Sequence, residues 1–369
     1  MRGVLEINLR FLSENIAKIK GVMPSNIRYF AVVKANAYGL GLEKMASFLG
    51  DRAHPLVDGL VVSDVQEALR VRSAHVDLPL LILCPMLDDE IDGLRQAKAI
   101  PLVSSIEELD RLQNFAKKWQ FKQDIHIKID TGMGRSGVWF REAEEIFVHM
   151  RKCDHLQVSG IATHFASVVA DRDFTELQLS RFLEIVRRHG QSNWLIHASS
   201  GFGIHQFING TNTVRIATLH YGIPSLEDDS LVKRLALKSI IRLSGFAMLI
   251  KNVPAGTGIG YGRTFFLERD TKIALLSLGY ADGCPVTLAN GGEVLIRGQR
   301  CRIIGNVSMD QMAIDVTHLP QVTVGDECVL IGRQGEEEIT LREFVRKLKL
   351  PNWACICTLS DRIVRKYIP

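Results

Sequence analysis

Eight short apolar runs alternate with segments of helical character along the N-terminal part of the chain. Most runs are rich in β-branched or aromatic residues, which is the pattern of a buried strand. Eight strands that alternate with helices are typical of a (β/α)8 barrel, whose active site lies at the carboxyl ends of the strands. The pattern therefore predicts an α/β TIM barrel. The expected strands cover residues 29–33, 59–62, 79–83, 100–103, 125–130, 158–162, 194–197 and 213–216.

From Lys238 onward the pattern changes to short β-rich runs that are interrupted by glycines. These runs predict a second, mainly β domain. We expect a barrel over residues 9–235 and a β-rich C-terminal domain over residues 236–369, which an N-terminal strand at residues 1–8 would join. The expected strands of the second domain cover residues 273–278, 294–296, 301–304, 312–316 and 328–331.

The composition argues against several classes of function. The chain has 369 residues, of which 46% are hydrophobic and 23% charged, and its net charge is +4 without a long basic tract. We therefore expect neither nucleic acid nor a membrane surface as a partner. No apolar run is long enough to span a membrane, and residues 1–8 are too polar for a signal peptide, so we expect a cytoplasmic protein.

The cysteines and histidines do not indicate a metal site. The seven cysteines are an odd number without a C-x-x-C pair, and the eleven histidines contain no H-E-x-x-H motif. We therefore expect neither a disulfide framework nor a bound metal.

Lys34 ends the first apolar strand and is followed by Tyr38 and two glycines, after which a helix is expected. A lysine that points inward is costly unless a partner, or a covalent bond to an aldehyde cofactor, accounts for it. Tyr38 and the glycines offer a hydroxyl and close backbone approach to an anion. The alternative is an edge-strand lysine whose amine reaches solvent.

The strand at residues 125–130 alternates strictly, with isoleucines on one face and His126, Lys128 and Asp130 on the other. If the polar face points into the barrel, Lys128 must be neutralised or paired. The glycine-containing turn that follows ends at Arg135, whose guanidinium can bind a carboxylate or a phenolate through two parallel bonds. The alternative is a glycine turn with a solvated arginine.

Further polar residues lie at the ends of later strands. His164 and His197 each close a strand, although a solitary histidine there is more often a satisfied core residue than a catalyst. Ser200 and Gly201 offer a hydroxyl and an unhindered backbone, which suit a phosphate. Arg215 lies within an apolar strand and therefore needs a nearby acceptor.

The glycine-rich segment at residues 255–265 does not match a nucleotide-binding motif. It is neither G-x-G-x-x-G nor G-x-x-x-x-G-K-[ST], and it follows no strand-to-helix unit. The segment instead displays Tyr261 from a loop. The alternative is a turn tyrosine packed against its own domain.

Six motifs, in this order along the chain, resemble those of the alanine racemase family. The likeness covers essentially the whole chain, and the joint match is far more specific than any single motif. It implies pyridoxal 5'-phosphate as cofactor, a barrel plus a β domain, a small amino-acid substrate, and a homodimer with active sites completed across the interface. The motifs are Val33-Lys34-Ala-Asn-Ala-Tyr38-Gly-x-Gly, Lys128-x-Asp130-Thr-Gly-Met-Gly-Arg135, Thr163-His164-Phe-Ala, Gly260-Tyr261-Gly-Arg-Thr-Phe, Leu278-Gly-Tyr280-Ala-Asp-Gly283 and Val307-Ser-Met309-Asp310-Gln.

The resemblance implies a racemase that interconverts L- and D-alanine by two-base exchange of the α-proton. Lys34 would form the aldimine with the cofactor and act as base on one face of the substrate. Tyr261, supplied by the partner subunit, would act on the other face. Arg135 and the Met309 backbone N–H would bind substrate, with Asp310 as a supporting residue.

The resemblance also assigns the residues around the cofactor. His164 would orient Tyr261, and Arg215, held by His197, would face the pyridine nitrogen. A guanidinium can donate there and keep its proton, so the ring would remain a weaker electron sink. Lys128 becomes a candidate carbamate that positions Arg135. The residues expected at the phosphate are Tyr38, Ser200, Gly201, Ala217 and Thr218.

Four positions depart from the family pattern. Ser199 and Ser200 do not reproduce the usual Asn-Ser pair, and Asn306 replaces a frequent arginine. Asp361 stands where many members have a tyrosine that lines the pocket, and the segment from Cys284 lacks a frequent arginine. We expect these changes to affect specificity, with serine more acceptable beside Asp361.

Three alternatives remain. One is a broad-specificity or serine-preferring racemase of the same family. Another is a decarboxylase of the same architecture, which Arg215 and the Tyr261 loop disfavour because such enzymes place an acidic residue at the pyridine nitrogen. The third is a non-catalytic cofactor carrier, which would have no need for the second domain and its Tyr261 motif.

Overall fold

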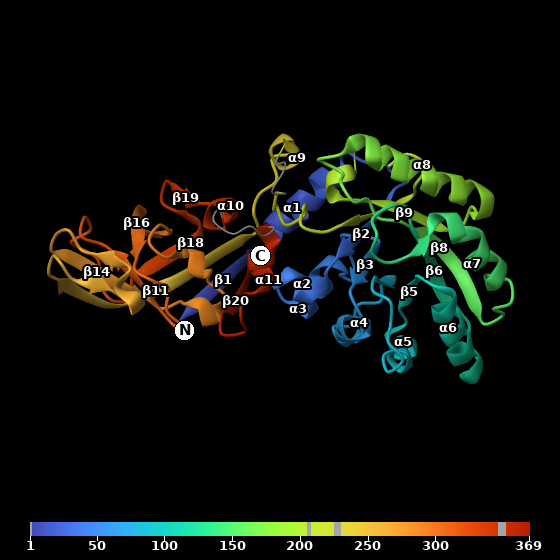
Figure 1. Ribbon diagram of the computed structural model, residues 1–369, viewed down its shortest axis with the longest axis horizontal. Coiled ribbons are helices and arrows are strands. Elements are labelled where there is room, and N and C mark those ends of the chain that lie inside the picture. The colour runs from blue at the N-terminus through green and yellow to red at the C-terminus, as the bar shows by residue number, and fades with distance from the viewer. Residues whose placement is uncertain (1, 205–207, 225–229, 346–351) are drawn as a thin grey trace.

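A computed structural model of the chain describes residues 2–204, 208–224, 230–345 and 352–369. The molecule is elongated, with a β/α barrel at one end and a β-rich domain at the other (Figure 1). Within the described ranges, no helix is both long enough and apolar enough to cross a membrane.

Eight parallel strands form the barrel. Their order is β5-β4-β3-β2-β10-β9-β8-β6, and β5 also pairs with β6, which closes the ring. Each strand expected from the sequence overlaps an observed one, so the predicted TIM barrel is confirmed. The strands are β2 (Arg28–Val32), β3 (Gly59–Val62), β4 (Leu80–Ile82), β5 (Ile100–Val103), β6 (Gln123–Asp130), β8 (Leu156–Ala162), β9 (Leu195–Ser200) and β10 (Thr213–Ile216).

Helices surround the barrel, and the short strand β7 (Val138–Trp139) pairs in parallel with the end of β6. Four of the helices are preceded by a polar N-cap residue whose side chain accepts a backbone N–H of the first turn. These residues are Asn8, Asp64, Ser105 and Asp171. The helices are α1 (Leu9–Lys20), α3 (Leu42–Leu49), α4 (Val65–Ser73), α5 (Ile91–Ala97), α6 (Ile106–Lys118), α7 (Ala143–Met150) and α8 (Arg172–His189), with α9 (Ser230–Arg234) leading out of the barrel.

The second domain is built on a sheet in the order β19-β18-β15-β16-β17-β14-β11-β1-β20, and β11 also pairs with β18. The first strand, β1, lies antiparallel to β11 and parallel to β20, so it belongs to this sheet rather than to the barrel. The strands are β1 (Gly3–Asn8), β11 (Ile241–Val253), β14 (Thr271–Leu276), β15 (Glu293–Ile296), β16 (Gln299–Ile304), β17 (Met312–Asp315), β18 (Glu327–Gln334), β19 (Glu337–Ile339) and β20 (Val364–Ile368).

The sequence pattern did not identify β11, although it is the longest strand of the molecule as described. Gly245 interrupts its apolar pattern, and a Cβ atom built there would lie 2.8 Å from Leu276 Cδ1. The glycine therefore allows close packing within the sheet rather than ending the strand. The edge strand β20 was also not identified, because the consecutive charged residues Arg365 and Lys366 interrupt its apolar pattern.

Two smaller features connect the second domain to the site. A hairpin of β12 (Gly258–Ile259) and β13 (Phe265–Phe266) carries the loop that contains Tyr261. The short helices α10 (Leu341–Phe344) and α11 (Asn352–Cys357) lie between β19 and β20 in the chain, and α11 lies beside the turn α2 (Lys34–Tyr38) of the barrel (Figure 1). The second domain thus contacts the barrel where Lys34 is located.

Candidate active site

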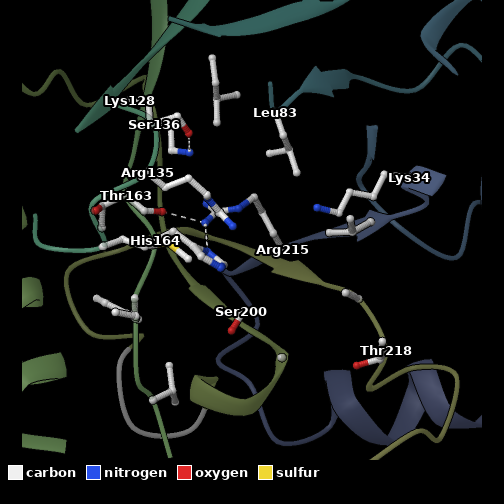
Figure 2. A pocket seen from close by; sticks show the side chains of 18 of the residues that line it. Lys34, Leu83, Lys128, Arg135, Ser136, Thr163, His164, Ser200, Arg215 and Thr218 are labelled. Carbon is white, nitrogen blue, oxygen red and sulfur yellow. Dashed lines mark hydrogen bonds between the residues drawn. The ribbon is translucent and has the colours of Figure 1, made fainter. Parts of the chain in front are cut away.

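A cavity of about 610 Å³ lies at the carboxyl ends of the barrel strands. Figure 2 shows the Lys34 amine pointing toward the Arg215 guanidinium, with Ser200 and Thr218 along another side. The structure brings together ten of the residues expected in the site, and they come from segments far apart in the sequence. These lining residues are Lys34, Tyr38, Lys128, Arg135, His164, Ser200, Gly201, Arg215, Ala217 and Thr218.

Lys34 begins a turn whose next residues have left-handed backbone conformation. Ala35, Asn36, Ala37 and Tyr38 have φ between 53° and 57°. This conformation costs roughly 1–2 kcal/mol for each residue with a side chain. The next residue, Gly39, also has a positive φ, of 83°. A glycine is required there for a second reason, because a Cβ atom would lie 2.3 Å from a backbone oxygen of α11. The sequence did not indicate this turn, although α3 does begin after the second glycine, as expected.

Arg215 is the central buried cation of the site, with an exposed fraction of 5%. Its Nη2 donates to Thr163 O at 2.7 Å and lies 3.3 Å from His164 Nδ1, while its Nη1 donates to His197 O at 3.0 Å and contacts His197 Nδ1. Burial, and then the charge of Arg135, lower the pKa of Arg215 to about 10. The guanidinium therefore stays protonated near neutral pH.

The histidines beside Arg215 are held neutral. Burial, and then the charge of Arg215, lower the pKa of His164 and that of His197 well below the usual value. Because His197 Nδ1 accepts from Arg215, its proton sits on Nε2 and can be donated to His126 Nδ1 at 2.8 Å. The same reasoning places the proton of His164 on Nε2. The polar face of β6 therefore points into the barrel.

Lys128 and Asp130 are not paired with each other. Lys128 Nζ donates to Ser136 Oγ at 2.5 Å. Asp130 Oδ1 accepts the backbone N–H groups of residues 132–134, and its Oδ2 accepts that of Arg135 at 2.9 Å. Burial raises the pKa of Asp130, but these four donors outweigh it and lower the pKa overall. Asp130 thus shapes the glycine turn that presents Arg135.

Burial is also the main influence on the Lys128 amine. It lowers the pKa of Lys128 to about 8, with further contributions from the charges of Arg135 and Arg215. A substantial fraction of this amine is therefore neutral at mildly alkaline pH.

The Ser200 and Thr218 side of the cavity can hold an anion. Burial raises the pKa of the Tyr38 hydroxyl well above its usual value, so it remains a hydrogen-bond donor. Ser199 is fully buried and its hydroxyl donates to the backbone of Ser200 at 3.0 Å. Its hydroxyl is therefore used within the strand end, while Ser200 lines the cavity.

These groups fit pyridoxal 5'-phosphate. The cavity offers an amine for the aldehyde, hydroxyls for the phosphate, and a guanidinium that can donate to a ring nitrogen. Groups suited to the aldehyde, the phosphate and the ring nitrogen of the cofactor are therefore present in one cavity.

Four expected residues do not line this cavity. One is His197, which is fully buried and contacts Arg215. The other three lie on the β domain. Tyr261 and Met309 lie on the surface of the β domain, with exposed fractions of 79% and 53%. Asp310 accepts a charge-assisted hydrogen bond from Arg362 at 2.7 Å. Asn306 Nδ2 donates to the carbonyl of Tyr261 at 2.9 Å, so the residue in place of the usual arginine fixes the Tyr261 loop. One chain does not bring this group to its own Lys34.

The sequence also missed residues that line the cavity. Cys84 lies two residues after the end of β4, so the rule that active-site residues lie at strand ends identifies it in retrospect. Trp353 reaches the cavity from α11 of the second domain. Nothing in its local sequence indicated a position beside a barrel more than one hundred residues earlier.

Comparison with known proteins follows the same division of the chain. The family description "Alanine racemase, N-terminal domain" matches residues 7–224, and "Alanine racemase, C-terminal domain" matches residues 240–367. The chain is 35% identical to the alanine racemase of Halothermothrix orenii over 367 residues, which is 98% of this chain and 96% of that protein. It is 36% identical to "Alanine racemase 2" of Caldanaerobacter subterraneus, with coverage of 99% and 94%.

Solved structures agree with these sequence comparisons. The alanine racemase of Clostridium difficile matches with a TM-score of 0.92 at 28% identity, over 100% of this chain and 96% of that one. The enzyme from E. faecalis matches with a TM-score of 0.89 at 30% identity, over 100% and 98%. Both domains therefore match those of alanine racemases, in the same order along the chain. This chain belongs to the alanine racemase family.

Proposed function

We propose that this protein is a racemase that interconverts L- and D-alanine with pyridoxal 5'-phosphate as cofactor. The observation that carries the proposal is the cavity in which the Lys34 amine faces the Arg215 guanidinium (Figure 2). A relative from Bacillus anthracis, 30% identical over the whole chain, was solved as an alanine racemase with bound L-Ala-P. The barrel over residues 9–235 would be the cofactor-binding unit.

The bound cofactor withdraws electrons from the α-carbon of the substrate and so makes the α-proton acidic. Lys34 would hold the cofactor covalently and remove or return a proton on one face of that carbon. Arg215 would donate to the ring nitrogen and keep its own proton, because its pKa of about 10 remains well above neutral. The phosphate would be held by Tyr38, Ser200, Gly201, Ala217 and Thr218.

Racemisation needs a second proton donor on the opposite face of a planar carbon. Tyr261 of the partner subunit would supply it, because the Tyr261 side chain is exposed and lines no part of the cavity in its own chain. The Nε2–H of His164 would donate to the phenol oxygen, which favours the ionised form. Met309, with Asp310 beside it, would reach the substrate carboxylate from the same partner surface. The active unit would therefore be a homodimer.

Arg135 would bind on the other side of the substrate, positioned by Lys128. A carbamate on Lys128 forms when the neutral amine attacks carbon dioxide and releases one proton. The lowered pKa of Lys128 supports this reaction because it increases the neutral fraction. The resulting anion could pair with the Arg135 guanidinium.

Asp361 is the residue that would most affect substrate choice. Its side chain is fully exposed in one chain and lies 3.7 Å from Arg365. A carboxylate in place of an aromatic ring would accept a hydrogen bond from a substrate hydroxyl, so we propose that serine is turned over alongside alanine.

The direct test is proton NMR of the purified protein with the cofactor in deuterated water. L-alanine and L-serine are incubated separately, and the products are separated by chirality. We expect loss of the α-proton signal together with appearance of the D-enantiomer. An unchanged α-proton with both substrates would contradict the proposed function, and release of carbon dioxide would indicate a decarboxylase.

A further inference from the structure

The carboxylate of Glu67 binds the turn that follows Lys34. Glu67 is the third residue of α4 and has an exposed fraction of only 9%. Its Oε1 accepts the backbone N–H of Asn36 at 3.0 Å, and its Oε2 accepts that of Ser63 at 2.9 Å. Asn36 lies in the middle of the left-handed turn, so a buried charge contacts the backbone where it is most constrained.

The side chain of Asn36 continues this network within the barrel. Its Oδ1 accepts the backbone N–H of Leu42 at 3.0 Å and a hydrogen bond from Arg70 at 2.8 Å. Arg70 is itself held by both carboxylate oxygens of Glu43. The backbone and the side chain of Asn36 are therefore fixed by different partners.

The second domain holds the same turn from the other side. Arg365 Nε donates to Gly39 O at 3.1 Å, and the Tyr367 hydroxyl donates to Leu40 O at 2.8 Å. Arg365 also donates to the carbonyls of Leu359 and Ser360 in the loop that leads to Asp361. The turn is thus bound on both sides, with Lys34 at its start.

We propose that Glu67 is a positioning residue for Lys34. By accepting the Asn36 N–H, its carboxylate stabilises the left-handed turn. The conformation of this turn determines where the Lys34 amine and the Tyr38 hydroxyl lie in the cavity. This inference rests on the proposed function, in which Lys34 binds the cofactor. Glu67 itself does not line the cavity, so it acts through the backbone.

The chain contains a matched control for this role. Glu108 is the third residue of α6 and is 2% exposed. Its Oε2 accepts the N–H of Ser104 at 2.8 Å, and its Oε1 accepts that of Met86 at 3.3 Å. The two glutamates therefore join the start of a helix to the preceding loop in the same way, but the loop held by Glu108 carries neither Lys34 nor a left-handed turn.

The test compares Glu67→Gln with Glu108→Gln in the full-length chain supplied with pyridoxal 5'-phosphate. A glutamine keeps the shape of the side chain but places an NH2 group against one of the two N–H donors. We expect both variants to unfold at lower temperature. Only Glu67→Gln should speed hydrogen exchange of residues 34–41, by about tenfold or more, and raise the cofactor dissociation constant by a similar factor.

The proposal would be overturned if hydrogen exchange of residues 34–41 increased equally in the two variants, or if it did not increase in Glu67→Gln. If Glu67→Gln does not fold, Glu67→Asp and Glu108→Asp give the same comparison, because each shortens its side chain by one methylene and weakens the same two hydrogen bonds. Unchanged exchange of residues 34–41 in Glu67→Asp would equally overturn the proposal. Borohydride reduction and mass spectrometry of the wild-type protein keep the two proposals apart. Absence of a cofactor adduct on Lys34 would refute the proposed function, whereas the exchange comparison can still be made on the chain alone.

Discussion

The cavity at the barrel mouth and the surface around Tyr261 differ in how far their functional side chains are buried and hydrogen-bonded within one chain. In the cavity, Arg215 is buried and hydrogen-bonded to five backbone or side-chain groups, which belong to β9 and to the two residues that follow β8. On the β domain, the side chains of Tyr261 and Met309 are exposed, and it is the backbone carbonyls of these residues that accept hydrogen bonds from the rest of the domain. The groups that must keep a defined charge are enclosed, whereas the groups that we propose to act on a partner subunit are exposed.

The largest expected effect is on racemase activity, when the cavity and the Tyr261 surface are inactivated in different chains. Lys34→Ala and Tyr261→Ala homodimers should each lose more than about 100-fold in kcat, because each lacks one of the two proton-transfer groups. Mixing the two variants, with unfolding and reassembly, should restore activity to about a quarter of the wild-type value, since half the dimers are mixed and contain one intact site. The measurement is racemase activity against the ratio of the two variants.

The control is each variant mixed with itself, which should recover no activity. If no mixture is active although mixed dimers form, Tyr261 does not act across the interface. Activity of the Tyr261→Ala homodimer near the wild-type level would remove that residue from the mechanism altogether.

Substitutions in the same two regions should also differ in their effect on the free energy of unfolding. Arg215→Leu leaves the carbonyls of Thr163 and His197 without their buried donor, and we expect the free energy of unfolding to fall by about 2–4 kcal/mol. Tyr261→Ala removes an exposed ring and should change it by less than about 0.5 kcal/mol at concentrations where the chain is monomeric. Denaturant unfolding of both variants measures the difference, and equal losses would contradict the contrast drawn above.

A third test uses the pH dependence of stability and concerns Lys128. Because burial lowers its pKa from the ordinary value of 10.5 to about 8, the unfolded chain binds more protons than the folded chain between these values. The wild-type protein should therefore gain stability relative to Lys128→Met as the pH rises from about 8 to 10.5, by at most about 3 kcal/mol. Below pH 8 the difference should be constant.

Bicarbonate sharpens this third test. A carbamate would remove the titrating amine, so the slope should diminish when carbon dioxide is supplied and return when it is excluded. Parallel stability curves of the wild type and the variant under both conditions would show that Lys128 has an ordinary pKa in the folded protein.

The smallest expected effect lies at the entrance of the site. Asp361→Tyr should lower the ratio of kcat/KM for serine to that for alanine by about tenfold, because one hydrogen-bond acceptor is replaced by a ring. Asp361→Asn is the matched variant, since it keeps an acceptor and should retain serine turnover. An unchanged ratio in Asp361→Tyr would place this residue outside substrate recognition.

The sequence predicted the barrel well because buried parallel strands are continuous apolar runs that local composition reveals. The rule that active-site residues of a barrel lie at the carboxyl ends of its strands pointed to Lys34 and His164, whereas Arg215 was noticed as a charged residue within an apolar strand; all three line the cavity. The identity of the reaction depended on resemblance, since physical reasoning from the residues reached only an anion-binding cavity that contains a lysine.

The features that sequence analysis missed depend on contacts between distant segments. Alanines and an asparagine do not signal a left-handed turn, which is stabilised here by Glu67 and by Arg365 from the end of the chain. The sequence indicates that an inward Lys128 needs a partner but not which one: Asp130 lies on the same face of β6, yet its oxygens accept backbone N–H groups of the next turn, and Lys128 donates to Ser136 instead. Such choices depend on geometry that local composition does not encode.

The position of β1 between β11 and β20 also has a consequence for the order in which the protein can fold. This strand is synthesised first, yet one neighbour follows the barrel and the other lies at residues 364–368. Until those segments leave the ribosome, both edges of β1 lack their final partners, and such edges invite pairing with other chains. The barrel is in effect an insertion within the sheet, so the second domain can be completed only after the barrel sequence has been made.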